Sequence, residues 1–218
     1  MNHQNPWHIL PHDIYEKHMG HETVKQLEML SRIVKDQLKL IVDVYPPVVA
    51  LLGITDGNGL ENIRPGACRE IIGMDINAEY LHICRNRYAH LPELTLYQID
   101  LMTEKDRAIE LLENADLLTA NLLIKHIHLG NFIDIISKLS KPVISVTIQF
   151  DPDGQAVSKS GYEQEFAQIQ RHGRDCDESG LLSAMDEAGF RLFGREEYIL
   201  PNKKVFIRLD FKRREVRP

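Results

Sequence analysis

The sequence has little cysteine and no secretory or membrane-spanning segment, and each absence narrows what the protein can be. Three of its 218 residues are cysteines, Cys68, Cys84 and Cys176, an odd number without the close spacing of metal ligands. We therefore expect no disulfide framework and no metal site, but reduced thiols in a cytoplasmic protein. The N-terminus lacks a basic segment followed by an apolar one, so no signal peptide is predicted. The most apolar stretch, 38–54, is interrupted by two charged residues and two prolines, so we expect no membrane span.

The chain has fewer basic than acidic residues, 26 against 32. The formal net charge is -6, and an acidic protein repels the phosphate backbone of nucleic acids. The one basic stretch, 212–217, fits a solvated C-terminus better than an RNA contact. We therefore expect a small-molecule partner, with no nucleic acid or membrane involved, while nothing in the sequence indicates an oligomeric state.

Short apolar runs alternate with segments of helical periodicity along most of the chain. An unbroken apolar run such as 48–52 is typical of a strand buried on both faces of a parallel sheet. Five strands are predicted in this alternating part, at 48–52, 71–74, 94–99, 115–120 and 143–149. Helices are predicted at 23–41, 78–88, 106–113 and 129–139. This order favours an α/β fold with a Rossmann-like, doubly wound, mostly parallel sheet.

The last third of the chain departs from this alternation. Residues 151–177 are polar and too long for a plain connector, which predicts a lid or an insertion with some helix of its own. A helix around 181–188 follows, and then two extended segments, 190–200 and 205–211, joined by a turn. These segments predict a C-terminal antiparallel β-hairpin, which brings the sheet to seven strands. We expect one compact domain, with 1–47 as an N-terminal helical cap on a Rossmann-like domain at 48–218.

Polar residues follow the predicted strands at the points where ligands bind in such sheets. Ligands of open α/β sheets bind outside the carboxyl ends of the strands. Gly53 and Gly57 belong to a glycine-rich turn after the first strand, whose free N–H groups are expected to bind a carboxylate or phosphate. Asp75 ends the second strand and could accept hydrogen bonds from the two ribose hydroxyls of a nucleotide. Asp100 ends the third strand, where it could bind an adenine amino group, and Asn121 ends the fourth, as a ligand contact or a helix cap.

With these motifs, the sequence resembles the class I S-adenosylmethionine-dependent methyltransferases. The resemblance rests on the stretches 49–59, 72–75 and 98–101 and on the closing hairpin. The family pattern at the first strand is acidic-x-Gly-x-Gly-x-Gly, and here Leu51 stands at the acidic position and Thr55 at the middle glycine. Carried over by position, the resemblance implies a cofactor site for S-adenosylmethionine. Its residues would be Gly53, Ile54, Thr55, Gly57, Asn58, Asp75, Ile76, Asp100, Leu101, Asn121 and Leu122.

Other residues are candidates for chemistry at the reacting end of this site. His126 and His128 follow the fourth strand, beside the expected methyl donor, and one of them could act as a general base. Tyr15, His18 and Met19 precede the first predicted helix and could fold over the cofactor as a lid, or serve in packing alone.

The resemblance implies a methyltransferase of EC class 2.1.1 acting on an unidentified small molecule. One alternative is an NAD(P)-dependent oxidoreductase, but its Gly-x-Gly-x-x-Gly fingerprint fails because Gly57 and Gly59 are followed by Asn62. The other alternative is a catalytically degenerate methyltransferase fold kept as a binding protein, an idea that Leu51 and Thr55 support.

Overall fold

Seven strands form one mixed sheet in the computed structural model, which describes residues 5–140, 142–152 and 161–214. The strand order is β3-β2-β1-β4-β5-β7-β6. The first five strands pair in parallel, while β7 lies antiparallel between β5 and β6. The strands are β1 (Val48–Leu52), β2 (Glu70–Asp75), β3 (Leu94–Gln98), β4 (Leu117–Asn121), β5 (Val143–Phe150), β6 (Phe190–Ile199) and β7 (Val205–Arg213). The predicted Rossmann-like sheet with its terminal hairpin is thereby confirmed.

Eight α-helices are present in the described part of the chain. They are α1 (His12–Met19), α2 (Gln26–Leu38), α3 (Ala78–Arg87), α4 (Lys105–Leu112), α5 (Ile124–Ile127), α6 (Leu129–Ile136), α7 (Glu163–His172) and α8 (Glu178–Glu187). Three short 3-10 turns accompany them, η1 (Pro6–His8), η2 (Lys39–Ile41) and η3 (Leu60–Asn62). None of the helices in the described ranges is long and apolar enough to cross a bilayer.

Helices α1 and α5 are additions to the sequence prediction, and helix α7 refines it. Helix α1 was not predicted, so the candidate lid residues Tyr15, His18 and Met19 lie on a helix and not on a segment before the first one. Helix α7 falls inside the polar stretch 151–177, which was expected to hold some helix. Residues 153–160 of that stretch lie outside the described residues.

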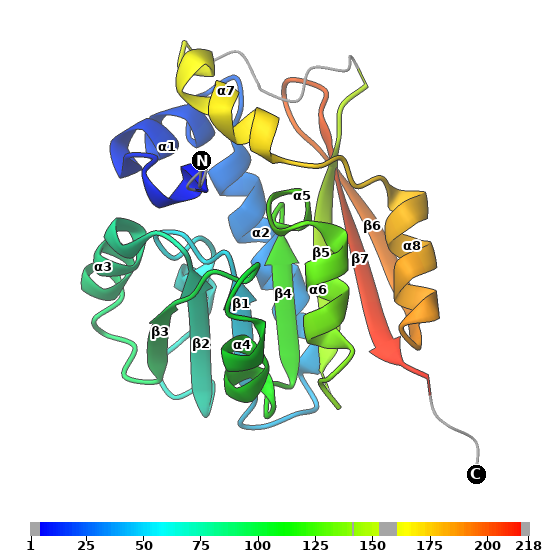
Figure 1. Cartoon of the computed structure of the whole chain (residues 1–218). Helices are drawn as coiled ribbons and strands as arrows, with labels where there is room; N and C mark the ends of the chain where they lie inside the picture. The colour runs from blue at the N-terminus through cyan, green and yellow to red at the C-terminus, as the bar shows by residue number, and fades with distance from the viewer. Residues whose placement is uncertain (1–4, 141, 153–160, 215–218) are drawn as a thin grey trace.

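Helices cover both faces of the sheet, which explains why all five residues of β1 are buried. Val48, Ala50 and Leu52 pack into a core with α4, α6 and α8, while Val49 and Leu51 pack with α3 on the opposite face (Figure 1). Alternate side chains of a strand point to opposite faces, so a strand between two helical layers must be apolar throughout.

Helix α2 belongs to the same packed unit as the sheet. Leu30 and Ile33 of α2 pack against Tyr198, Leu200 and Phe206 of the C-terminal hairpin. Helix α2 thus shares an apolar cluster with the last two strands. The division of the chain at residue 47 into a cap and a sheet domain stays a prediction.

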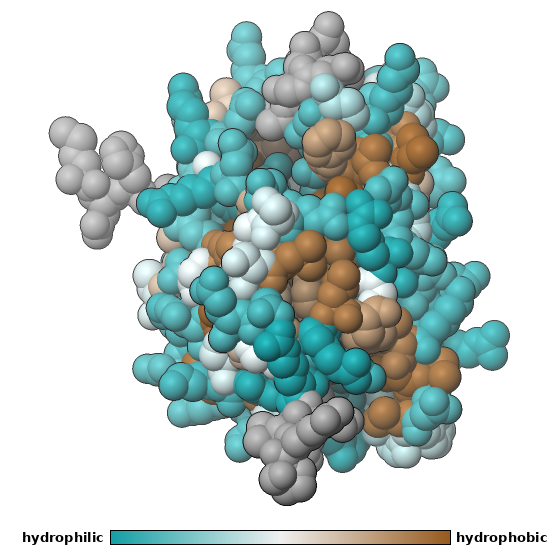
Figure 2. Space-filling model, turned by 90° about the vertical axis from the view of Figure 1, so that its right-hand side faces the viewer, coloured by the Kyte–Doolittle hydropathy of each residue, from teal (hydrophilic) through white to brown (hydrophobic). Residues whose placement is uncertain are grey.

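Strand β6 forms the outer edge of the sheet on the hairpin side. Figure 2 shows the molecule from that side, where hydrophobic patches lie among polar residues. Leu192, Phe193 and Ile199 of β6 are among the exposed large hydrophobic residues of the protein. Arg195 on the same strand forms ion pairs with Glu178 and Glu197, and such charges discourage edge-to-edge pairing of sheets.

Candidate functional site

A deep pocket opens at the carboxyl ends of the parallel strands. Its walls come from the ends of β1, β2, β4 and β5 and from the segment after β3, and also from α1, α2, the segment after β4 and α7. Helices α1 and α7 lie together over this end of the sheet (Figure 1). The topology therefore places the pocket where open α/β sheets bind ligands.

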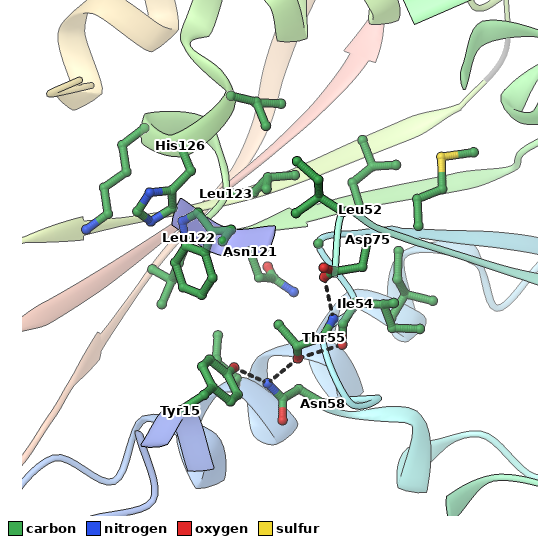
Figure 3. Close-up of a pocket in the computed structure, with 18 of the residues that line it drawn as sticks. Tyr15, Leu52, Ile54, Thr55, Asn58, Asp75, Asn121, Leu122, Leu123 and His126 are labelled. Atoms are coloured by element: carbon green, nitrogen blue, oxygen red, sulfur yellow. Dashed lines mark hydrogen bonds between the residues drawn. The ribbon is translucent and has the colours of Figure 1, made fainter. Parts of the chain in front are cut away.

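Most of the residues singled out in the sequence line this one pocket. Asp75 and Ile54 lie on one side of it in Figure 3, and Asn121, Leu122 and His126 lie on the other. The predicted residues in the lining are Tyr15, His18, Met19, Gly53, Ile54, Thr55, Asn58, Asp75, Ile76, Asp100, Leu101, Asn121, Leu122 and His126. Gly57 and His128 are not among the lining residues.

Four backbone N–H groups of the glycine-rich turn after β1 donate hydrogen bonds to other groups of the protein. The amides of Gly53 and Ile54 both donate to the carbonyl of Met74, at 2.8 and 3.1 Å. The amide of Thr55 donates to Asp75 Oδ2 at 2.9 Å, and that of Gly57 to the carbonyl of Ile54 at 3.0 Å. The expectation that free N–H groups of this turn bind a carboxylate or phosphate is therefore wrong for these four amides, because each already has a partner.

The glycine at position 57 is explained by packing. Its φ of +101° is in the left-handed region, and a Cβ built there would overlap the ring of Tyr88, with Cδ2 only 2.8 Å away. No side chain fits so close to a ring, so the turn needs glycine at this point whether or not a ligand is bound. Gly53 also has a positive φ, +67°, but unlike Gly57 it lines the pocket.

Asp75 is the central acidic group of the pocket. Its Oδ2 accepts from the Thr55 amide and its Oδ1 from the Asn77 amide, both at 2.9 Å. Burial raises the pKa of Asp75 to about 6, although the two amides oppose the shift by stabilising the charged form. Each carboxylate oxygen can accept more than one hydrogen bond, so both oxygens can still receive hydroxyl groups from a ligand.

Thr55 takes the backbone conformation of the glycine that it replaces. Its φ is +53°, an uncommon value for a residue with a branched side chain. The hydroxyl donates to the Ile54 carbonyl at 2.7 Å and accepts from Asn58 Nδ2 at 3.0 Å. Asn58 Nδ2 also donates to the Tyr15 hydroxyl at 2.7 Å, which links α1 to the turn (Figure 3).

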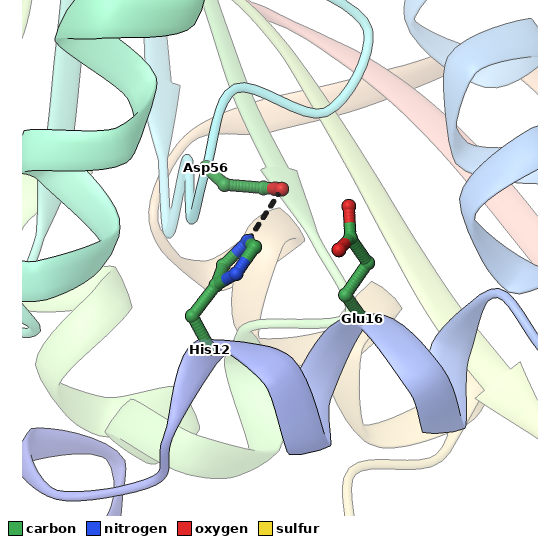
Figure 4. Close-up of side chains that lie close together, drawn as sticks. All are labelled: His12, Glu16 and Asp56. Atoms are coloured by element: carbon green, nitrogen blue, oxygen red, sulfur yellow. Dashed lines mark hydrogen bonds and ion pairs between the residues drawn. The ribbon is translucent and has the colours of Figure 1, made fainter.

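Asp56 is not among the residues that line the pocket, and it forms a second link between α1 and the turn. It is 1% exposed and lies 2.9 Å from His12 Nε2 and 2.5 Å from the Arg87 guanidinium. His12, Glu16 and Asp56 place donor atoms within 4.8 Å of one another, as metal ligands would (Figure 4). Arg87 pairs with both carboxylates, because it also contacts Glu16 at 3.2 Å, so this group forms an ion-pair network that holds α1 in place.

Asp100 and Leu101 lie in the wall next to Asp75. The amide of Met102 donates to Asp100 Oδ1 at 2.9 Å, which fixes the carboxylate in a turn just after β3. Leu101 is buried in the core. With Ile76, these residues give the pocket a region in which apolar side chains lie beside two carboxylates.

Asn121 belongs to a buried polar network and caps no helix. Its Oδ1 accepts from Gln37 Nε2 at 2.8 Å and from the Thr147 hydroxyl at 2.7 Å, and its Nδ2 donates to Gln37 Oε1 at 3.1 Å. Ser145 continues the network by accepting from Gln37 and donating to Asp210 at 2.6 Å. One N–H of the Asn121 amide has no partner within this network, so it can serve a ligand.

The two candidate bases are placed differently. His126 is buried in the pocket wall. Its ring packs edge to face against the ring of Trp7, with the two ring centroids 4.9 Å apart. Burial lowers the pKa of His126 well below its usual value, and the nearby Lys125 adds to the effect, so the ring is neutral at physiological pH. His128 stands between α5 and α6 with its ring 5.9 Å from that of His172.

Several lining residues were missed in the sequence. Phe166 and Ile169 of α7 are spaced three apart on one buried face of that helix, a short apolar signal inside a polar stretch. Gln26 and Leu30 of α2 also line the pocket, as does Lys125. Their roles depend on where α2 and α7 dock, which sequence spacing does not indicate.

No known protein family and no curated protein matches the chain in sequence. Solved structures do resemble it. Magnesium protoporphyrin IX methyltransferase from Synechocystis PCC 6803 with bound S-adenosylmethionine has a TM-score of 0.65 and 14% identity, covering 95% of this chain and 93% of that one. Geranyl diphosphate C-methyltransferase from Streptomyces coelicolor A3(2) has a TM-score of 0.63 and 12% identity, over 90% and 86%. The [4+2]-cyclase SpnF has a TM-score of 0.63 and 15% identity, over 84% and 81%. At these identities the likeness shows a shared fold.

Proposed function

From the class I methyltransferase fold, which this chain has, we propose that it is an S-adenosylmethionine-dependent methyltransferase acting on a small molecule. One of the similar structures is a [4+2]-cyclase, so the fold by itself does not choose the reaction. The choice of ligand rests on the pocket.

The observation that carries the proposal is the state of the turn after β1. A dinucleotide places its pyrophosphate on free N–H groups of this turn and on the helix that follows. Here the amides of Gly53, Ile54 and Thr55 have internal partners. The next element is the three-residue turn η3. These three amides therefore offer no cradle to a pyrophosphate, which disfavours NAD(P) and suits a nucleoside without phosphates.

The residues present fit the adenosine part of the cofactor. Asp75 would accept hydrogen bonds from the two ribose hydroxyls, Asp100 one from the adenine amino group, and Ile76 and Leu101 would flank the ring. Backbone amides donate hydrogen bonds to both carboxylates and thereby fix their orientation in the pocket. Helices α1 and α7 cover the pocket and would exclude water from the reacting groups. S-adenosylmethionine, when bound, supplies a methyl group activated by its positive sulfur.

The methionine part would be held without the usual acid. Leu51 packs in the core at that position and lines the pocket, so it offers no charge to an ammonium group. Neutral side chains lie in the same wall, among them Gln26 and Asn121, whose amides can bind the amino-acid end through hydrogen bonds. We infer a cofactor affinity that depends mainly on the adenosine half.

Isothermal titration calorimetry tests the proposal. S-adenosylmethionine and S-adenosylhomocysteine should bind, and NADH should not. Asp75→Asn should weaken binding about 10-fold or more, since hydrogen bonds to a charged group are strong. Asp134→Asn is the matched control, because that carboxylate is 62% exposed on α6. Absence of binding at millimolar S-adenosylmethionine, or tighter binding of NADH, would refute the assignment. Binding without turnover on any acceptor would point to the degenerate alternative.

A further inference from the structure

The part of the pocket away from Asp75 and Asp100 is where an acceptor would lie, if the proposed function holds. It is walled by α1, by the segment after β4 and by α7. Its apolar lining residues are Trp7, Met19, Leu122, Leu123, Phe166 and Ile169. This composition selects a molecule with a sizeable apolar body.

The charged groups of this part are of one sign. Among the described residues that line the pocket, Asp75 and Asp100 are the only carboxylates, and both belong to the proposed adenosine half. Lys125 is the one lysine or arginine among the described residues that line the pocket, and burial lowers the pKa of its amine. The two acids whose charges raise the pKa of Lys125, Asp151 and Asp175, line a neighbouring pocket, to which Lys125 also contributes.

Asp151 is already committed to other groups. It lies 3.1 Å from the Lys204 ammonium and accepts a hydrogen bond from Gln149 at 2.7 Å. Its charge is thus balanced by Lys204. Lys125 is half-buried, and no carboxylate of the described residues forms an ion pair with it, so it favours an anionic ligand that supplies one.

His126 adds a second hydrogen-bond donor beside Lys125. Its Nδ1 is buried and has no hydrogen-bond partner among the described residues. A Cβ built on Gly173 would lie 3.7 Å from this atom, so Nδ1 faces the backbone after α7. A buried N–H without an acceptor is costlier and rarer than a buried lone pair without a donor. The neutral ring therefore keeps its proton on Nε2, the nitrogen left to meet a bound molecule.

We propose that the acceptor is an apolar carboxylic acid, held through its carboxylate by Lys125 and by the Nε2–H of His126, and that the product is its methyl ester. This assigns His126 the role of a donor, in place of the general base expected from the sequence. A carboxylic acid acceptor also explains why this part of the pocket has no carboxylate among its described lining residues to act as a base. Such an acid is already ionised at neutral pH, so the enzyme does not need to deprotonate it.

The chemical step balances without an added proton acceptor. A carboxylate oxygen attacks the methyl carbon in line with the C–S bond. A C–O bond forms as the C–S bond breaks, and its electron pair stays on sulfur. One negative and one positive charge disappear together, which leaves a neutral ester and a neutral thioether. The protein contributes alignment and a dry site.

The test uses the full-length protein and S-adenosylmethionine labelled with tritium in the methyl group. The probes are matched pairs, decanoic acid with decanamide and indole-3-acetic acid with indole-3-acetamide. We expect label to enter an acid and to be released as methanol by mild base, since esters are base-labile. Lys125→Gln should raise KM for the acid about 10- to 100-fold, as expected for a lost charged hydrogen bond, and leave the Kd for S-adenosylmethionine unchanged.

Two controls keep the variant interpretable. Lys125→Arg should restore most of the affinity for the acid, and Lys138→Gln, which alters an exposed lysine on the surface, should behave as the wild type. Base-stable label, amides accepted as well as their acids, or cofactor binding with no acid methylated would each overturn this inference while leaving the proposed function standing. Failure to bind S-adenosylmethionine at all would instead refute the proposed function.

Discussion

Replacing Asp75 by asparagine should change the pH dependence of folding stability in the protein without ligand. The buried carboxyl has its pKa raised from 3.8 to about 6. The folded protein therefore holds this proton more tightly than the unfolded chain, and each pH unit of difference is worth about 1.4 kcal/mol. Ionising Asp75 in the folded state consequently costs about 3 kcal/mol.

The sign follows from this difference. Because the folded pKa lies above the unfolded value, the wild type loses stability as pH rises from about 4 to about 6 and carries the full cost at pH 7.5. The asparagine side chain does not ionise, so the variant carries no such cost at any pH. Between pH 7.5 and pH 4.5 the wild type should gain about 2 kcal/mol relative to Asp75→Asn.

The substitution also changes the hydrogen bonds of the side chain, which shifts the stability of the variant by the same amount at every pH. Asparagine keeps one oxygen for the amides of Thr55 and Asn77 and loses the other, at a cost of about 1 kcal/mol at every pH. The variant should therefore be more stable than the wild type by about 2 kcal/mol at pH 7.5 and about as stable as the wild type at pH 4.5.

Urea unfolding at the two pH values measures both differences. Asp134→Asn serves as control, since changing a 62% exposed side chain should alter stability by less than about 0.5 kcal/mol at either pH. If the difference between wild type and Asp75→Asn is the same at pH 4.5 and pH 7.5, then Asp75 is not a buried carboxyl with a raised pKa.

Three further predictions concern the same region. Affinity for S-adenosylmethionine should fall below pH 6 by about 10-fold per pH unit, because protonated Asp75 offers the ribose fewer acceptors; a flat calorimetric profile from pH 7.5 to 5 would count against the ribose contact. Gly57→Ala should lower stability by about 3 kcal/mol or more in urea, through its clash with the Tyr88 ring and its positive φ, and unchanged stability would disprove the packing argument. Asp56→Asn should release α1 from the turn, seen as faster limited proteolysis near residues 12–19 than in Asp13→Asn; equal rates would show that the ion pairs do not hold the helix.

The alternation of elements and the polar strand ends were readable in the sequence because each depends on local pattern. The apolar run 48–52 becomes β1 with the predicted bounds, and Asp75 ends β2 as expected. A strand covered on both faces must be apolar throughout, and parallel strands bring their carboxyl ends to one edge of the sheet. Those two facts are enough to draw Gly53, Asp75 and Asn121 into one pocket from residue order alone.

Only the tertiary structure decided which groups are free to act. The amides after β1 look available in the sequence, yet Gly53 and Ile54 donate to Met74, a residue on the neighbouring strand. His126 and His128 are equivalent in a sequence pattern, yet the pocket includes one of them among its lining residues. Hydrogen-bond partners and docked helices come from residues far apart along the chain, and spacing carries no information about which of them meet.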